Sequence, residues 1–349
     1  MLNSRLGVEL ASIATAFVLL LAAPLYLSDF SLNLLGQFLA LAILAIGLDL
    51  IWGYTGILSL GQGVFFGLGA YGMAMYLKLA ALGPGELPDF MTWSGIEELP
   101  AIWQPFQSFP LTLLLIVLIP GLLAWLLGAL VFRSRIKGVY FSILTQALAV
   151  IVATLFVDQQ ELTGGSSGLT NFQSLFGMPL NEPETQVRLY YASLLILLGV
   201  YLLARWITGS SMGKILRAIR DAENRTRFCG YNPTAYKAFV FGLAAVFAAV
   251  AGALYVPQNG IIAPAMLGVV PSIEMVIWVA LGGRGTLIGA ILGTLIVNYT
   301  KYYLSNAYPD FWLYFLGSLF LLVVLAFPQG IVGSLPRIER SKAQKVQTA

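Results

Sequence analysis

The sequence predicts an all-α protein, a polytopic bundle of transmembrane helices. Of its 349 residues, 58% are hydrophobic and only 10% are charged, whereas soluble domains carry about 25% charged residues. The apolar residues form repeated runs near twenty residues long, the length that a helix needs to cross about 30 Å of hydrocarbon. Lys and Arg gather in short segments between these runs, as they do on the cytoplasmic side of membrane proteins.

The pattern predicts about ten spans, with both termini in the cytoplasm. In chain order the predicted spans cover 9–28, 33–52, 60–81, 111–132, 138–157, 188–207, 237–257, 266–283, 286–305 and 311–328. The first run has no clear small-residue cleavage site, so we interpret it as a retained helix and not as a signal peptide.

The sides of the membrane follow from the charges between the spans. Segments 82–110 and 158–187 contain acidic residues and no Lys or Arg, which places them outside the cell. The opening stretch, the loop with Arg133, Arg135 and Lys137, and the C-terminal tail are basic and therefore cytoplasmic. We divide the chain into a transmembrane domain, 1–336, and a basic tail, 337–349.

The third and eighth predicted spans contain irregular sequence. Glycines crowd the region of the third: Gly53, Gly56, Gly61, Gly63, Gly67, Gly69 and Gly72. Such density allows close helix packing or an unwound segment beside a cavity. In the eighth, Pro264, Pro271 and Glu274 predict a broken or kinked helix. A short internal similarity also relates Gly53-Tyr-Thr-Gly56-Ile-Leu58 to Gly282-Gly-Arg-Gly285-Thr-Leu287, and many transporters are built from repeated halves.

The most charged stretch, Ser210 to Lys237, predicts a short amphipathic cytoplasmic helix. It holds six of the nineteen Lys and Arg residues. Ser210 or Ser211 suits the helix start, and Gly230 suits its end. An apolar stripe at helical spacing, Met212, Ile215, Leu216 and Ile219, lies opposite Lys214, Arg217, Arg220 and Asp221. A merely solvated basic loop is the alternative, but it needs no apolar stripe, so we favour a docking helix.

Several classes of function are excluded by what the sequence lacks. Histidine is absent and Cys229 is the only cysteine, which argues against zinc sites, Cys–His pairs, disulfides and haem attachment. No phosphate-binding G-x-x-x-x-G-K-[ST] loop occurs, so the chain is not expected to hydrolyse nucleotide. The net charge of +3 resides in loops at membrane edges. We therefore expect membrane lipid around the chain, no nucleic-acid partner, no cofactor and no metal.

Polar residues within spans cost free energy and are often functional. The candidates for a translocation path are Ser59, Gln62, Thr145, Gln146 and Glu274. Gln62, Thr145 and Gln146 also suit hydrogen bonds between helices that never meet a substrate. Glu274 is expected either to pair with a cation at a subunit interface or to lie in an outer vestibule. No shell of carboxylates indicates proton coupling.

Several motifs, in order along nearly the whole chain, resemble those of permeases from ABC importers for branched-chain amino acids and their relatives. They are Gly56-Ile-Leu-Ser-Leu-Gly-Gln-Gly63, Lys137-Gly-Val-Tyr-Phe-Ser142, Leu162-Thr-Gly-Gly165 with Gly168-Leu-Thr170, Gly213 to Glu223, and Gly282-Gly-Arg-Gly-Thr-Leu287. Segment Pro88 to Phe109, Thr170-Asn-Phe172 and the stretch Asn298 to Gly333 are most similar to the urea-importer branch of that family.

The resemblance implies an inner-membrane, multi-pass permease that carries urea, with branched-chain or other amino acids as the alternative cargo. It also implies a second homologous permease, two cytoplasmic ATPase subunits and a periplasmic binding protein, for which the acidic outer segments suit docking. The coupling segment would be 208–237, with contacts from Met212, Gly213, Lys214, Ile215, Leu216, Arg217, Ile219, Arg220, Asp221 and Glu223. An ion-coupled secondary transporter is a more distant alternative, and a membrane enzyme lacks a catalytic constellation here.

Overall fold

Long helices dominate the fold, as predicted. The computed structural model describes residues 17–83, 86–134, 138–309, 314–315, 317–319, 321 and 330–333. Within these ranges six helical segments are long and apolar enough to cross a membrane. They are α2 (Asp29–Asp49) with its π-helical extension η2 (Leu50–Thr55), α3 (Gln62–Ala80), α5 (Phe109–Arg133), α6 (Gly138–Asp158), α8 (Pro183–Gly209) and α10 (Pro233–Asn259). The all-α class is therefore confirmed.

The predicted eighth and ninth spans form one bent pair. Helices α11 (Val269–Gly282) and α12 (Leu287–Ala307) meet at an angle of 120° across a short break. Because α11 has 14 residues, it is about 21 Å long at 1.5 Å per residue and too short to cross the bilayer. The break lies between the predicted eighth and ninth spans, at 283–286, and not inside the eighth, where α11 is one uninterrupted helix. Pro271 lies in the first turn of α11, and Pro264 opens a separate 3₁₀ turn, η5 (Pro264–Leu267).

The predicted count of ten spans stays untested. The first predicted span begins outside the described residues, and its visible part is helical to Leu21 and then a 3₁₀ turn, η1 (Ala23–Leu25). Most of the tenth, 311–328, and the whole tail, 337–349, also lie outside the described residues. The third predicted span is a continuous helix from Gln62, and the unwound segment lies just before it, over 56–61.

The core of the bundle is formed by α2, α3 and α10. Helix α2 is apolar on all sides and buried over most of its length, as expected for a central helix. Small residues bring α3 and α10 close: a Cβ atom on Gly69 would overlap the backbone of Ala249, and one on Gly252 would overlap that of Phe66. In contrast, α5 and α6 expose large apolar side chains along their outer faces, a surface suited to lipid or another subunit.

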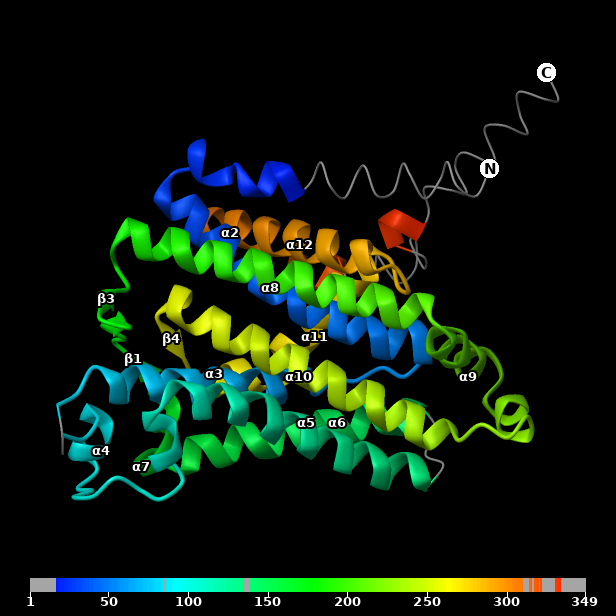
Figure 1. Cartoon of the computed structure of the whole chain (residues 1–349), viewed down its shortest axis with the longest axis horizontal. Helices are drawn as coiled ribbons and strands as arrows, with labels where there is room; N and C mark the ends of the chain where they lie inside the picture. The colour runs from blue at the N-terminus through cyan, green and yellow to red at the C-terminus, as the bar shows by residue number, and fades with distance from the viewer. Residues whose placement is uncertain are drawn as a thin grey trace.

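The two ends of the bundle differ, as Figure 1 shows. Helix α9 (Ser211–Phe228) lies at one end. The opposite end carries α4 (Asp89–Trp93), α7 (Gln160–Thr163) and the short strands, with η3 (Gln104–Gln107) and η4 (Gly165–Ser167) in the same outer segments. There β1 (Leu169–Thr170) pairs with β4 (Ile261–Ile262), and β2 (Ser174–Leu175) pairs with β3 (Met178–Pro179), both antiparallel. The basic segment and the acidic segments are thus separated by the length of the bundle, as their charges predicted.

The close approach of α3 and α10 makes Gly252 sensitive to substitution. We expect Gly252→Leu to force the two helices apart and to lower stability by about 1–3 kcal/mol, the usual cost of overpacking. Thermal unfolding of the purified protein in detergent measures this change. Gly199→Leu is the matched control, because a Cβ there meets nothing within 4 Å. Equal unfolding temperatures for the two variants would contradict the packing argument.

Candidate functional site

The candidate site is the end of the bundle that carries α9. The helix begins as the sequence predicts, because the Ser210 side chain accepts a hydrogen bond of 3.2 Å from the Met212 backbone N–H. It ends at Phe228, just before Gly230, which adopts a positive φ of 89°. Gly213 touches the preceding helix so closely that a Cβ would overlap the Thr208 carbonyl. Both ends of the helix are therefore fixed by α8 and α10.

The apolar stripe of α9 faces the protein's own helices. Leu216 and Ile219 are buried, and Met212 and Ile215 are half-buried. Leu216 belongs to the main hydrophobic core, and Met212 packs against it. The stripe that the sequence offered as evidence for docking thus anchors α9 to the bundle. The surface left for a partner is the charged face, where Lys214, Arg217 and Asp221 are exposed.

Arg220 is exposed on the predicted charged face, but its side chain also reaches a membrane helix. Its Nη1 donates a hydrogen bond of 2.7 Å to the carbonyl of Gly53, in the π-helical turn at the end of α2. Its Nε also donates to Asp221 Oδ1 at 2.9 Å. Arg220 therefore joins α9 to a membrane helix and is not a simple surface charge.

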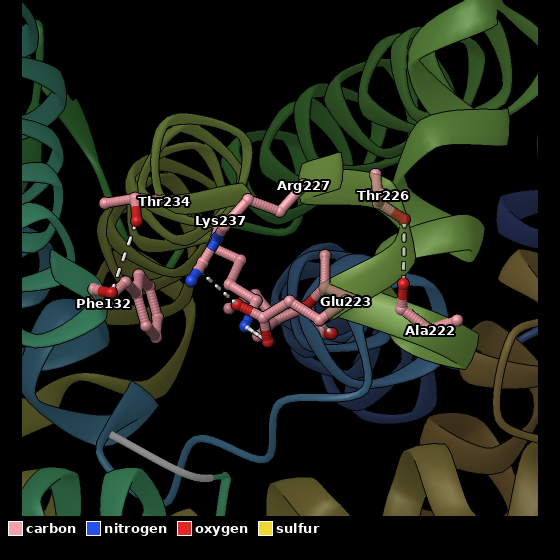
Figure 2. Close-up of polar contacts among 9 residues, drawn as sticks. Phe132, Ala222, Glu223, Thr226, Arg227, Thr234 and Lys237 are labelled. Atoms are coloured by element: carbon pink, nitrogen blue, oxygen red, sulfur yellow. Dashed lines mark hydrogen bonds and ion pairs between the residues drawn. The ribbon is translucent and has the colours of Figure 1, made fainter. Parts of the chain in front are cut away.

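The second half of α9 is set off by a break at Ala222, whose φ and ψ of −156° and 73° are not helical. Directly after it, Glu223 accepts from Lys237 Nζ at 2.5 Å and from Arg227 at 3.3 Å (Figure 2). Lys237 Nζ also lies 5.7 Å from the centre of the Phe132 ring. These contacts fasten the bent end of α9 to the ends of α5 and α10.

A cavity of about 470 Å³ opens beside this bend. Its apolar wall includes Phe132 and Phe141 from α5 and α6, and its polar wall includes Glu223, Arg225 and Lys237. Basic groups outnumber the one carboxylate in this wall, so the cavity favours an acidic side chain. The cavity lies at the same end of the bundle as the exposed charged face of α9.

Three of the predicted path residues lie together around the unwound segment before α3. Ser59, Gln62 and Thr145 are all buried. Thr145 Oγ1 of α6 accepts from the Leu60 backbone N–H at 3.0 Å, while Ser59 Oγ lies 3.5 Å from the Gly61 backbone N. In the described part of the chain, neither amide atom of the Gln62 side chain has a hydrogen-bond partner. Thr145 thus makes a hydrogen bond from α6 to the backbone of the unwound segment, which is one of the two roles that the sequence left open for it. The Gln62 side chain is left able to form hydrogen bonds with another group.

The other two path candidates lie apart from this group. Gln146 is half-buried on α6. Glu274 of α11 pairs with Lys301 of α12, at 3.0 and 2.7 Å from Lys301 Nζ to its two carboxylate oxygens. Of the two expectations for Glu274, the cation partner is present, and it comes from the same chain. The ion pair stabilises the bent pair α11–α12.

Sequence reasoning missed two hydroxyl groups, one that binds the unwound segment and one that binds the start of α3. Ser142 Oγ donates to the Leu58 carbonyl at 2.7 Å, and Ser272 Oγ accepts from the Gly63 N–H at 3.3 Å. Ser142 closes one of the family motifs, and Ser272 follows Pro271 in the eighth predicted span, so both lay within recognised signals. Nothing in their spacing indicated that they face residues 84 and 209 positions away.

Comparison with known proteins finds transport permeases, the class of protein that the sequence motifs resemble. A family model for the permease component of the branched-chain amino acid transport system matches residues 30–324. The LivM protein of Salmonella typhimurium, a high-affinity branched-chain amino acid transport system permease, is 26% identical over 90% of this chain and 73% of its own length. LivH of the same organism is 26% identical over 86% of this chain and 92% of its own length. A probable LivM of Methanocaldococcus jannaschii is 26% identical over 87% and 93%, respectively. No solved structure matches the chain significantly.

The contact between Thr145 and the unwound segment gives a direct prediction. Thr145→Val removes the hydroxyl at similar volume and leaves the half-buried Leu60 N–H without this acceptor, so we expect a loss of about 1 kcal/mol in stability. Thermal unfolding in detergent measures it. Thr145→Ser keeps the hydroxyl and is expected to lie closer to the wild-type protein. A Val variant as stable as the Ser variant would show that this hydrogen bond contributes little.

Proposed function

We propose a function for this chain on the basis of its family. The chain belongs to the permease components of branched-chain amino acid transport systems. The chain is a multi-pass protein of the inner membrane, and it is similar to transport permeases and not to enzymes. Its role is that of one permease subunit in an ATP-driven importer. The observation that carries this role is the charged face of α9, exposed at one end of a bundle whose sequence matches the family over residues 30–324.

The proposed importer contains a second permease. One organism, Salmonella typhimurium, has both a LivM and a LivH permease protein, and this chain is 26% identical to each. Such a pair of homologues suits a heterodimer with a path between the subunits. The broad apolar faces of α5 and α6 offer surface for that contact as well as for lipid.

The energy source in this proposal is a pair of cytoplasmic ATPase subunits. The sequence has no phosphate-binding loop of its own. Lys214, Arg217 and the neighbouring cavity with Arg225 and Lys237 form a basic surface, which suits an acidic groove on an ATPase subunit. At the opposite end, the acidic segments 82–110 and 158–187 suit a periplasmic binding protein that delivers the substrate.

Branched-chain amino acids are the favoured cargo. The family description and all three relatives named above refer to branched-chain amino acid transport, and this supports the amino-acid alternative over urea. Urea stays a second candidate because of one observation: Ser59, Gln62 and Thr145, the buried groups around the unwound segment, are hydroxyls and an amide without net charge. Such groups suit a small neutral solute.

The docking proposal predicts the effect of reversing charge on α9. We expect Lys214→Glu with Arg217→Glu to leave the permease in the membrane and to lower the ATPase subunit recovered with it about tenfold or more, because repulsion replaces attraction. Purification through a tag on this chain measures the recovery. Lys214→Arg with Arg217→Lys keeps the charges and is the control. Arg220 is left unchanged, because its side chain binds Gly53. Unchanged recovery in the Glu variant would remove this face from the interface.

A competition experiment separates the two cargoes. In a strain that depends on this importer, we expect labelled leucine uptake to be suppressed by excess isoleucine and to be unaffected by excess urea. ATP depletion is expected to abolish uptake, whereas a secondary transporter would lose it on dissipation of the ion gradient. Labelled urea uptake that leucine does not suppress would reverse the assignment of cargo.

A further inference from the structure

The two glycine motifs that resemble one another in sequence meet in space. Gly53-Tyr-Thr-Gly56 ends α2, and Gly282-Gly-Arg-Gly285 contains the break between α11 and α12. A Cβ atom on Gly53 would lie 2.5 Å from the Gly285 backbone N and 2.7 Å from its Cα. Only glycine fits at position 53 without moving the break. The end of a central helix is therefore packed directly on the corner of the bent pair.

A buried carboxylate fixes this contact. Asp49, one helical turn before Gly53, is fully buried, and its Oδ1 accepts a hydrogen bond of 2.7 Å from the Gly285 N–H. Gly285 has a positive φ of 80°, which presents its N–H to this acceptor. A carboxylate without hydrogen bonds is costly to bury. The bond to Gly285 thus gives α2 a specific attachment to the α11–α12 corner.

Helix α9 reaches the same point through Arg220. Its Nη1 donates to the Gly53 carbonyl, and its Cγ would lie 2.9 Å from a Cβ on Gly56. Arg284, inside the corner itself, lies over the Trp52 ring at 5.3 Å from the ring centre. Segments far apart in the sequence are therefore joined by Asp49, Gly53, Arg220 and Gly285, which we call the cytoplasmic joint.

We propose that the cytoplasmic joint transmits movement of α9 to the bent pair α11–α12, with Asp49 and Gly53 as its positioning residues. This inference rests on the proposed function, since it assumes that an ATPase subunit moves α9. A displacement of α9 pulls on the Gly53 carbonyl through Arg220. Because Gly53 touches Gly285, and Asp49 holds the Gly285 N–H, the corner of the bent pair must follow.

The bent pair in turn contacts the start of α3, directly after the unwound segment. Ser272 lies in the first turn of α11 and accepts from Gly63 at the start of α3, next to Gln62. The Glu274–Lys301 ion pair joins α11 to α12. The route therefore runs from α9 through the cytoplasmic joint to α11, and then to the start of α3. Proximity alone does not establish coupling, so the test must measure coupling itself.

The test uses the whole importer purified through a tag on this chain and reconstituted into liposomes. Gly53→Ala places a methyl group between Asp49 and Gly285, and Asp49→Leu removes the acceptor of the Gly285 N–H. Asp49→Asn keeps an oxygen acceptor and is the conservative variant. Gly199→Ala is the matched control, since a Cβ there meets nothing within 4 Å. The measurements are the amount of ATPase subunit bound, the rate of ATP hydrolysis and the leucine taken up per ATP hydrolysed.

For Gly53→Ala and Asp49→Leu, we expect assembly within about twofold of wild type and a loss of about tenfold in uptake per ATP, within the usual range of coupling between sites. Asp49→Asn is expected to recover most of the ratio. A merely structural role would lower assembly, hydrolysis and uptake together and leave the ratio constant. An unchanged ratio in both variants, or an Asn variant as impaired as the Leu variant, would overturn the proposal. Failure of the wild-type chain to bind any ATPase subunit would instead overturn the proposed function.

Discussion

The organisation of this protein depends on one constraint: inside a membrane, every backbone polar group needs a partner within the protein. The chain leaves helical conformation over 56–61, between α2 and α3, and again at the corner of α11 and α12. In both places the freed groups are bound by side chains from distant helices. Ser142 and Thr145 bind the first segment, and Asp49 binds the second. At these two places the hydrogen-bond partners come from α6 and α2, respectively.

The same need for hydrogen-bond partners explains several of the polar residues in the spans. Thr145 and Ser272 hold the backbone in place, whereas the Gln62 side chain has no partner among the described residues. A buried amide without partners costs free energy, so Gln62 stays a candidate for the proposed translocation path. The presence or absence of hydrogen-bond partners therefore distinguishes residues that hold the backbone from a candidate path residue, which polarity alone does not.

The amphipathic spacing of α9 predicted a helix, but the apolar face of that helix has a different partner from the one expected. The stripe of Met212, Ile215, Leu216 and Ile219 predicted a helix correctly, and that helix begins after Ser210 as its capping residue indicated. An apolar stripe needs a partner, but spacing alone does not identify it. The structure places the stripe against the chain's own bundle and leaves the charged face of α9 exposed.

The sequence by itself determined the all-α class, the separation of basic and acidic segments and the resemblance to importer permeases. These properties depend on composition, local spacing and motifs, which act over a few residues. Only the tertiary structure decided that Arg220 binds the Gly53 carbonyl, that Glu274 pairs with Lys301, and that Gly53 touches Gly285. The last contact joins residues more than 200 positions apart in the sequence. The physical reason is that helix packing fixes such contacts, and many packings satisfy the same hydrophobic pattern.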